Sequence, residues 1–257
     1  MMVPTEQHRD GPDVQVDLAL AAELQAALLP TSRPPCCEHQ HIAALNRMCG
    51  SVGGDFYDFI RINEDQVAIV IGDVVGHGVQ AALMMARIMG MLRSDVARAS
   101  RPRDMILQLN ELLLDLGDRT GSVLPCSLFY TVIDAPSGVS FFINAGHPMP
   151  FLCDRDQCAA LHLGPRNILL GVEDFQPREG CHTFVPGERL VLYTDGILDA
   201  AAPDGDRFDE QRLHDVVNRN LAAPPEELAR AIFTAVEEFR LGARQTDDET
   251  IVVVDRI

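Results

Sequence analysis

Residues 69–86 read IVIGDVVGHGVQAALMMA, and the rest of the chain is best interpreted from this stretch. An apolar run ends at a single carboxylate, Asp73, and a glycine-flanked turn, Gly76-His77-Gly78, then leads into a helical segment. A short apolar run bounded by turn residues is typical of a buried strand. The stretch therefore predicts a strand that presents Asp73 to a tight loop at a sheet edge, a common place for a metal ligand.

Three further aspartates are presented in the same way, in Gly53-Gly54-Asp55, Thr194-Asp195-Gly196 and Asp247-Asp248-Glu249-Thr250. Asp55 begins one predicted strand and Asp73 ends the next, with a hairpin turn at 63–66 between them. In an antiparallel hairpin the start of one strand lies beside the end of the other, so these two carboxylates should meet. Four such positions in one chain predict a carboxylate cluster for hard cations.

Composition limits the possible functions. The 257 residues are 47% hydrophobic, which is enough for one large domain with a buried core. The net charge of −17 argues against nucleic-acid binding and disfavours adhesion to anionic membranes. No apolar stretch reaches the about 18 residues of a membrane span. The seven cysteines include no Cys-x-x-Cys pair, so reduced thiols and a cytoplasmic location are the simplest interpretation.

Hydrophobic periodicity predicts the order of elements as strands, two helices, strands, two helices and a strand. The predicted strands cover 42–49, 55–60, 67–74, 127–133, 139–144, 149–153, 188–193 and 249–254. The predicted helices cover 79–99, 104–116, 209–221 and 225–241, and a loop rich in Gly and Pro covers 164–180. This order fits an α+β fold, a four-layer α-β-β-α sandwich of two mainly antiparallel sheets flanked by helices.

The N-terminal region divides into a flexible arm at 1–12 and a linker or regulatory helix at 13–30, ahead of the main domain at 31–257. The helix is predicted to carry one apolar stripe, formed by Val14, Leu18, Ala21, Leu24 and Leu28. Such a stripe suits either a helix packed on its own domain or one that dimerises or transmits a signal, and both interpretations stay open.

Oxygen ligands in octahedral geometry are what Mg²⁺ and Mn²⁺ prefer, and a few carboxylates suffice to hold them. Two such ions about 3.5–4 Å apart can bridge a hydroxide and hold phosphate oxygens for in-line displacement. The chain has no Cys-x5-Arg loop, no Gly-x-Ser-x-Gly elbow and no Gly-x4-Gly-Lys cradle that would supply another phosphate chemistry. The sequence therefore favours a metal-dependent phosphatase.

The same stretches resemble the motifs of the PPM-type serine/threonine phosphatases, especially the bacterial SpoIIE/RsbU branch. The matching stretches are SVGGDFYDF (51–59), GDVVGHGVQAAL (72–83), NAGHPMP (144–150), LYTDGILDA (192–200) and DDETIVVV (247–254). AAELQAALLP (21–30) also resembles the linker helix of that branch. The resemblance implies an α-β-β-α sandwich with a two-metal centre that holds Mn²⁺ or Mg²⁺.

Carried over by motif, the resemblance assigns a role to each carboxylate. Asp73 would bridge both ions, and the backbone carbonyl of Val74 would complete the ligands of one. Asp195 and Asp247 would bind the second ion, and Asp55 would hold a metal or a metal-bound water. Together these four aspartates form the expected catalytic set.

Three further residues have open roles. Asp199 matches a position that can support an additional metal, although this branch more often has Glu there. His77 is a possible proton donor, but its spacing from Asp73 differs from that of the histidine in the wider family. His147 is either a ligand, an acid or a loop histidine bonded to backbone.

The resemblance implies a phosphoserine or phosphothreonine substrate on an anti-sigma-factor antagonist, a STAS-domain protein, in bacterial signalling. A regulatory partner, or a homodimer through the 14–29 helix, is expected. Two alternatives remain. One is a catalytically silent binding module with a phosphatase fold. The other is a nucleotide cyclase, which Gly53-Gly54-Asp55-Phe56 superficially suggests but the later motifs do not.

Overall fold

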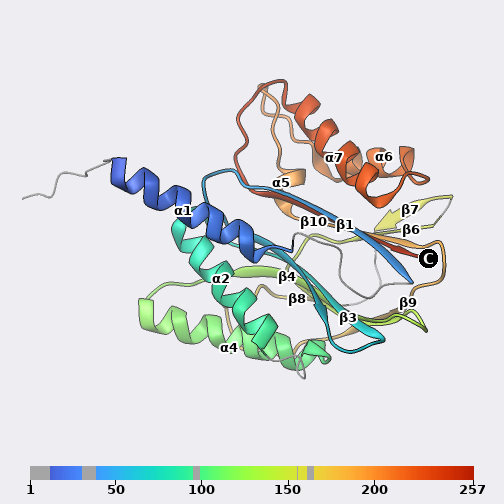
Figure 1. Ribbon diagram of the computed structural model, residues 1–257, viewed down its shortest axis with the longest axis horizontal. Coiled ribbons are helices and arrows are strands. Elements are labelled where there is room, and N and C mark those ends of the chain that lie inside the picture. Colours follow the sequence, from blue (N-terminus) through green and yellow to red (C-terminus); the bar gives the residue numbers. More distant parts are fainter. Residues whose placement is uncertain (1–11, 31–38, 95–98, 155, 161–164) are drawn as a thin grey trace, which may run out of the picture.

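The computed structural model describes residues 12–30, 39–94, 99–154, 156–160 and 165–257 (Figure 1). One sheet has five strands in the order β1 (Gln40–Arg47), β11 (Glu249–Arg256), β10 (Arg189–Tyr193), β6 (Phe151–Cys153) and β7 (Cys158–Ala160). The second has six: β2 (Asp55–Arg61), β3 (Gln66–Val74), β4 (Cys126–Asp134), β5 (Val139–Ala145) and β8 (Arg166–Asn167), with β9 (Gly180–Thr183) also paired to β5. All pairs are antiparallel except β5 with β8.

Helices cover both outer faces, as Figure 1 shows. The outer face of the second sheet packs on α2 (Val79–Ser94) and α4 (Pro102–Thr120), and that of the first packs on α6 (Asp209–Arg219) and α7 (Pro225–Arg240). A third apolar cluster, with Ile69, Phe129 and Val252 at its centre, lies between the sheets. Strands buried on both faces explain why the central ones are apolar almost throughout. The predicted four-layer α-β-β-α sandwich is confirmed.

The N-terminal helix, α1 (Pro12–Leu28), lies beside α2 (Figure 1). Its inner side includes Gln25, which is buried. Leu28 on the same side is partly buried and packs against the core next to α2 and α4. Val14 and Leu24 of the predicted stripe are instead exposed, by 53% and 64%. Leu18, Ala21 and Leu28 of the stripe are half-buried, so the stripe was wrong only for Val14 and Leu24. This helix carries apolar residues on several sides, so periodicity alone does not select the buried face. The predicted arm at 1–12 lies outside the described residues except for Pro12, as do positions 95–98 of the helix predicted at 79–99.

Several short elements were not predicted. The Gly- and Pro-rich loop at 164–180 contains β8 and leads into β9, and α5 (Asp195–Leu198) follows β10 directly. Cys153 and Cys158 are joined by a disulfide, so the expectation of reduced thiols is wrong for this pair. The two cysteines lie directly opposite each other in the β6–β7 register, which brings their sulfurs together. Among the described helices none has the length and hydropathy needed to cross a bilayer.

Candidate metal centre

The end of β3 and the start of β2 bring the first two carboxylates together. Asp55 and Asp73 are directly opposite in the β2–β3 register. Gly54 allows this close approach, because a Cβ there would lie 2.5 Å from the Val74 carbonyl oxygen and 3.0 Å from Asp73 Oδ1. The absence of a side chain at Gly54 thus leaves room beside two oxygen atoms that could bind a metal, the Val74 carbonyl oxygen and Asp73 Oδ1.

The other two carboxylates come from the first sheet. Asp195 is the first residue of α5, and Asp247 lies in the loop that leads into β11. The Thr194 N–H donates to the Thr250 carbonyl over 3.1 Å, and a Cβ on Gly196 would overlap the Asp248 backbone. Residues 194–196 and 247–250 are thus in direct contact, so Asp195 and Asp247 lie at the same end of the molecule.

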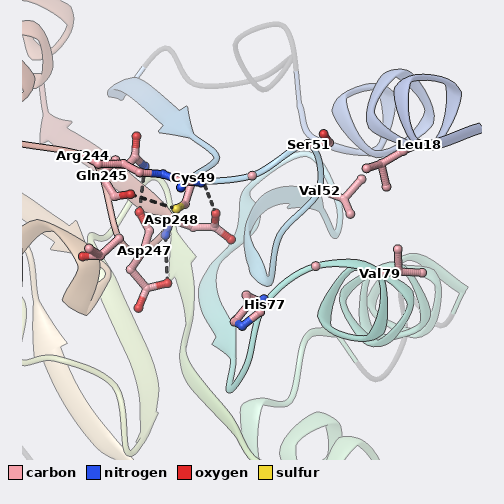
Figure 2. A pocket seen from close by; sticks show the side chains of 13 residues that line it. Leu18, Cys49, Ser51, Val52, His77, Val79, Arg244, Gln245, Asp247 and Asp248 are labelled. Atoms are coloured by element: carbon pink, nitrogen blue, oxygen red, sulfur yellow. Dashed lines mark hydrogen bonds between the residues drawn. The ribbon is translucent and has the colours of Figure 1, made fainter. Parts of the chain in front are cut away.

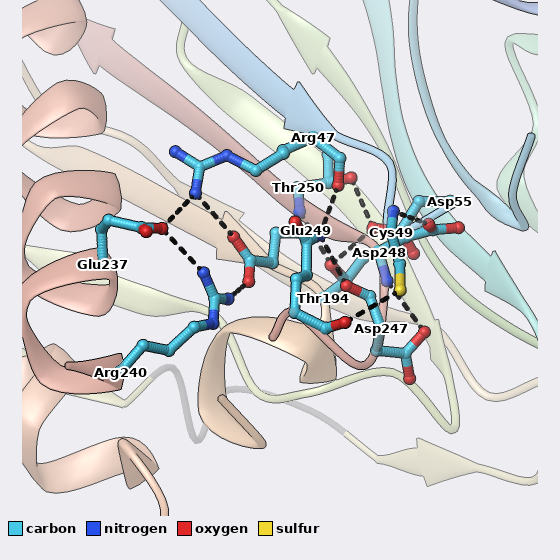
Figure 3. A network of polar contacts seen from close by, with 11 residues as sticks. Arg47, Cys49, Asp55, Thr194, Glu237, Arg240, Asp247, Asp248, Glu249 and Thr250 are labelled. Atoms are coloured by element: carbon cyan, nitrogen blue, oxygen red, sulfur yellow. Dashed lines mark hydrogen bonds and ion pairs between the residues drawn. The ribbon is translucent and has the colours of Figure 1, made fainter. Parts of the chain in front are cut away.

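A pair of hydroxyls joins the two sheets at this end, as Figure 3 shows. Thr194 Oγ1 and Thr250 Oγ1 both donate to Asp55 Oδ2, over 2.8 Å and 2.6 Å. Asp55 is 1% exposed, so it links the sheets rather than facing solvent. The threonines were missed from the sequence, although each lies inside a motif that was recognised.

Asp248 has a structural role. Its Oδ1 accepts from the Cys49 N–H over 2.7 Å and its Oδ2 from the Gly54 N–H over 2.8 Å. A Cβ on Gly53 would overlap this carboxylate, which accounts for the first glycine of the Gly53-Gly54 pair. Asp248 therefore fixes the loop before Asp55, while Asp247 beside it stays exposed.

On the opposite face of β11, a charged network anchors the same loop (Figure 3). Glu249 is fully buried and pairs with Arg240 of α7. Arg47 Nη1 lies 3.9 Å from Glu249 Oε2 and 2.8 Å from Glu237 Oε2. Arg240 also reaches Glu237, over 3.0 Å. The start of β11 is thus held from both sides.

Burial, and then the charges of neighbouring carboxylates, raise the pKa of all four aspartates. Burial raises the pKa of Asp73 from 3.8 to about 7, with the charges of Asp195, Asp247 and Asp248 adding to the effect. Burial, followed by the charge of Asp73, raises the pKa of Asp55 well above its usual value. The pKa values of Asp195 and Asp247 are raised as well, first by burial. Such mutual repulsion is what a bound cation would relieve.

The donor set fits a hard divalent ion. It consists of carboxylate oxygens and the Val74 carbonyl, the ligand types that Mg²⁺ and Mn²⁺ take. Within the described ranges, no three His, Cys, Asp or Glu side chains already converge on one point. Binding therefore requires rearrangement of these side chains, of which those of Asp195 and Asp247 are exposed.

The three residues with open roles lie in different surroundings. His77 is exposed and lines the same cleft as Asp247 (Figure 2). His147 is 2% exposed, its Nδ1 lies 2.8 Å from Ser127 Oγ, and burial lowers its pKa to about 3, so it stays neutral. Asp199 pairs with Arg207 over 2.6 Å. Asp58, three residues after Asp55 in the same strand, is buried and pairs with Arg93 of α2 over 2.6 Å.

Two clefts open beside the carboxylates. The first, here called the Asp247 cleft, has a volume of about 470 Å³ and is lined by α1, the 49–52 loop, His77 and Arg244 (Figure 2). The second, here called the Asp73 cleft, has a volume of about 410 Å³ and is lined by Asp73 and Asp195 together with His147 and Arg166. The acidic cluster is thus approachable from two sides.

Two face-to-face sheets between helix pairs, with aspartates from both sheets gathered at one end, define a domain of the PPM (PP2C) phosphatase class. Residues 63–257 match the family described as Stage II sporulation protein E (SpoIIE). This chain belongs to the SpoIIE family.

Comparison with known proteins agrees with this assignment. The chain is 28% identical to Protein IcfG of Synechocystis over 98% of its length, and 25% identical to phosphoserine phosphatase RsbP of Bacillus subtilis over 93%. It spans only 43% and 57% of those two relatives.

Solved structures show the same fold. The SiaA-PP2C domain of Pseudomonas aeruginosa superimposes with a TM-score of 0.81 at 25% identity, covering 95% of this chain and 97% of that domain. The phosphatase domain and regulatory fragment of SpoIIE from Bacillus subtilis give a TM-score of 0.71 at 21% identity, covering 84% of this chain and 63% of that one.

Proposed function

We propose that this protein is a metal-dependent serine/threonine phosphatase that hydrolyses phosphoserine or phosphothreonine monoesters. The observation that carries the proposal is that Asp55, Asp73, Asp195 and Asp247, from two sheets, lie close enough at one end of the sandwich for their charges to affect one another's pKa. Burial and mutual charge raise the pKa of all four carboxylates, as expected where cations are to be held. The relatives RsbP and RsbU of Bacillus subtilis are named phosphoserine phosphatases.

In this proposal Asp73 and the Val74 carbonyl hold one of two Mn²⁺ or Mg²⁺ ions. Asp73, Asp195 and Asp247 hold the other. When bound, the ions lower the pKa of water and neutralise charge on phosphate oxygens. The hydroxyls of Thr194 and Thr250 hold the carboxylate of Asp55 in place opposite Asp73. We place these roles within a phosphatase domain at 31–257.

The proposed protein substrate is a phosphorylated anti-sigma-factor antagonist of the STAS type, acting in a cytoplasmic bacterial signalling pathway. The membership in the SpoIIE family and the likeness to RsbU and RsbP support this choice.

We further propose that the helix at 13–30 receives a regulatory partner or a second copy of this chain. Its exposed apolar side chains, Val16, Leu20 and Leu24, are 67%, 55% and 64% exposed. Gln25 connects the same helix to the site, because its Nε2 donates to the Gly53 carbonyl over 2.7 Å and its Oε1 accepts from the Gly53 N–H over 3.0 Å. Removal of residues 1–29 is expected to change oligomeric state or activity, and removal of residues 1–11 alone serves as the control.

The decisive experiment compares hydrolysis of p-nitrophenyl phosphate and of a phosphoserine protein with and without Mn²⁺. Wild type is expected to require the metal, and Asp73→Ala and Asp195→Ala to lose at least about 100-fold in kcat/KM. Asp174→Ala, an exposed aspartate outside both clefts, is the matched control. Metal-independent turnover would refute the mechanism, and absence of Mn²⁺ and Mg²⁺ binding would favour the silent binding module.

A further inference from the structure

The Asp73 cleft contains carboxylates from both sheets and one cation. Asp73 reaches it from β3 and Asp195 from α5, while Arg166 is the one positively charged side chain among the described residues that line it. In a protein with a net charge of −17, a cation beside the acidic cluster stands out against the surrounding charge. Arg166 was not singled out from the sequence, because it lies in a stretch without a recognised motif.

The backbone of Arg166 is held in place by its neighbours. Arg166 pairs with Asn144 in the parallel β5–β8 register. Asn167 Nδ2 donates to the Asn144 and Arg178 carbonyls, each over 3.1 Å, and the Gly146 N–H donates to the Asn167 carbonyl over 3.0 Å. The short strand β8 is therefore fixed to the turn that carries His147, and Arg166 stands at a defined place on the rim of the cleft.

The guanidinium itself is available. Arg166 is exposed, and within the described part of the chain it makes no hydrogen bond or ion pair. Most other arginines near the site are engaged: Arg207 by Asp199, and Arg240 by Glu237 and Glu249. A planar guanidinium with free N–H groups is suited to bind two oxygens of a phosphate at once.

We infer that Arg166 binds the phosphate of the substrate, and that the phosphorylated side chain enters through the Asp73 cleft. The inference rests on the proposed phosphatase function and names a binding residue for it. A phosphoserine carries a charge of about −1.5 to −2 near neutral pH, so a cation on the rim, in addition to the bound metal ions, attracts the ester and orients its phosphate. Val75, Leu169 and Leu198 provide apolar wall for the residues that flank it.

The Asp247 cleft is the rival entrance, with Arg244 as its cation. The Asp247 cleft has fewer groups available to bind a phosphate than the Asp73 cleft. Both oxygens of Asp248 there are occupied by backbone N–H groups, and of the four predicted catalytic aspartates only Asp247 lines it. Arg244→Ala is therefore the sharpest comparison for Arg166→Ala.

The test uses the full chain with Mn²⁺ and measures two quantities. These are KM and kcat for p-nitrophenyl phosphate, and the binding of orthophosphate by calorimetry. Arg166→Ala is expected to raise KM and the phosphate dissociation constant about 10- to 100-fold, with a smaller change in kcat. Arg166→Lys should recover part of the loss. Arg230→Ala, at an exposed arginine outside both clefts, should stay within about twofold of wild type, as should the Mn²⁺ affinity of Arg166→Ala.

Two results would overturn the inference: unchanged phosphate binding in Arg166→Ala, or a loss in Arg244→Ala with none in Arg166→Ala. Absence of metal-dependent turnover in wild type would instead refute the proposed function. Calorimetry would still decide the role of Arg166, because phosphate binding does not require turnover.

Discussion

Asp73→Asn is expected to abolish activity and yet make the metal-free protein more stable. Burial and three neighbouring carboxylates raise the pKa of Asp73 from 3.8 to about 7, a difference that corresponds to about 4 kcal/mol. Because the folded-state pKa is the higher one, this contribution to stability is full below about pH 4 and is lost as the pH rises through about 7. Asparagine is neutral throughout, so the variant avoids the loss.

The assay is thermal unfolding in EDTA between pH 4 and pH 8. At pH 8 the variant should unfold several degrees above wild type, by up to about 4 kcal/mol in free energy, and near pH 4 the two should converge. Adding Mn²⁺ should stabilise wild type strongly and the variant little. Asp174→Asn, at an exposed position, should match wild type in both series. A variant that is less stable than wild type at pH 8 in EDTA would contradict the reasoning.

Four further substitutions test other parts of the structure. Gly54→Ala places a methyl group against the Val74 carbonyl and should lower metal-dependent kcat/KM about 100-fold. Gly90 of α2 has open space around it, so Gly90→Ala should instead stabilise the protein by about 0.5–1 kcal/mol in urea unfolding. Ile69→Ala, fully buried between the sheets, should cost about 2–5 kcal/mol in the same assay, and a smaller cost would argue against tight inter-sheet packing. Asp58→Ala removes the partner of Arg93 and should cost about 1–3 kcal/mol while leaving the specific activity of folded protein unchanged; lost activity would bring Asp58 into the site.

The sequence predicted the layers and the central strands because strands buried on both faces leave long apolar runs. It also placed Asp55 opposite Asp73, since a short hairpin fixes that register locally. That Asp195 and Asp247 join them was predicted only from their similar position at strand edges and from the family resemblance, because no local rule brings two distant loops together. Local register therefore accounts for the placement of Asp55 beside Asp73 but not for that of the other two aspartates.

Other features left no readable signal. β8 has two residues, too few for any periodicity, so Arg166 could not be placed beside the carboxylates. α1 is apolar on several sides, and its buried face is selected by a polar residue, Gln25, that pattern analysis assigns to solvent. The Cys153–Cys158 bond depends on cross-strand register in a three-residue strand. The place of Arg166, the buried face of α1 and the disulfide all depend on tertiary contacts rather than on local sequence pattern.

The position of β11 in the first sheet determines when the cluster of four carboxylates can form during folding. This strand lies between β1 and β10, although Gln40–Arg47 precedes it by most of the chain. Until Glu249–Arg256 has been synthesised, β1 and β10 have no partner to join them, and Asp247 has no fixed place. Asp55 and Asp73 can meet earlier in their own hairpin, but all four carboxylates come together only when β11 has paired with both β1 and β10.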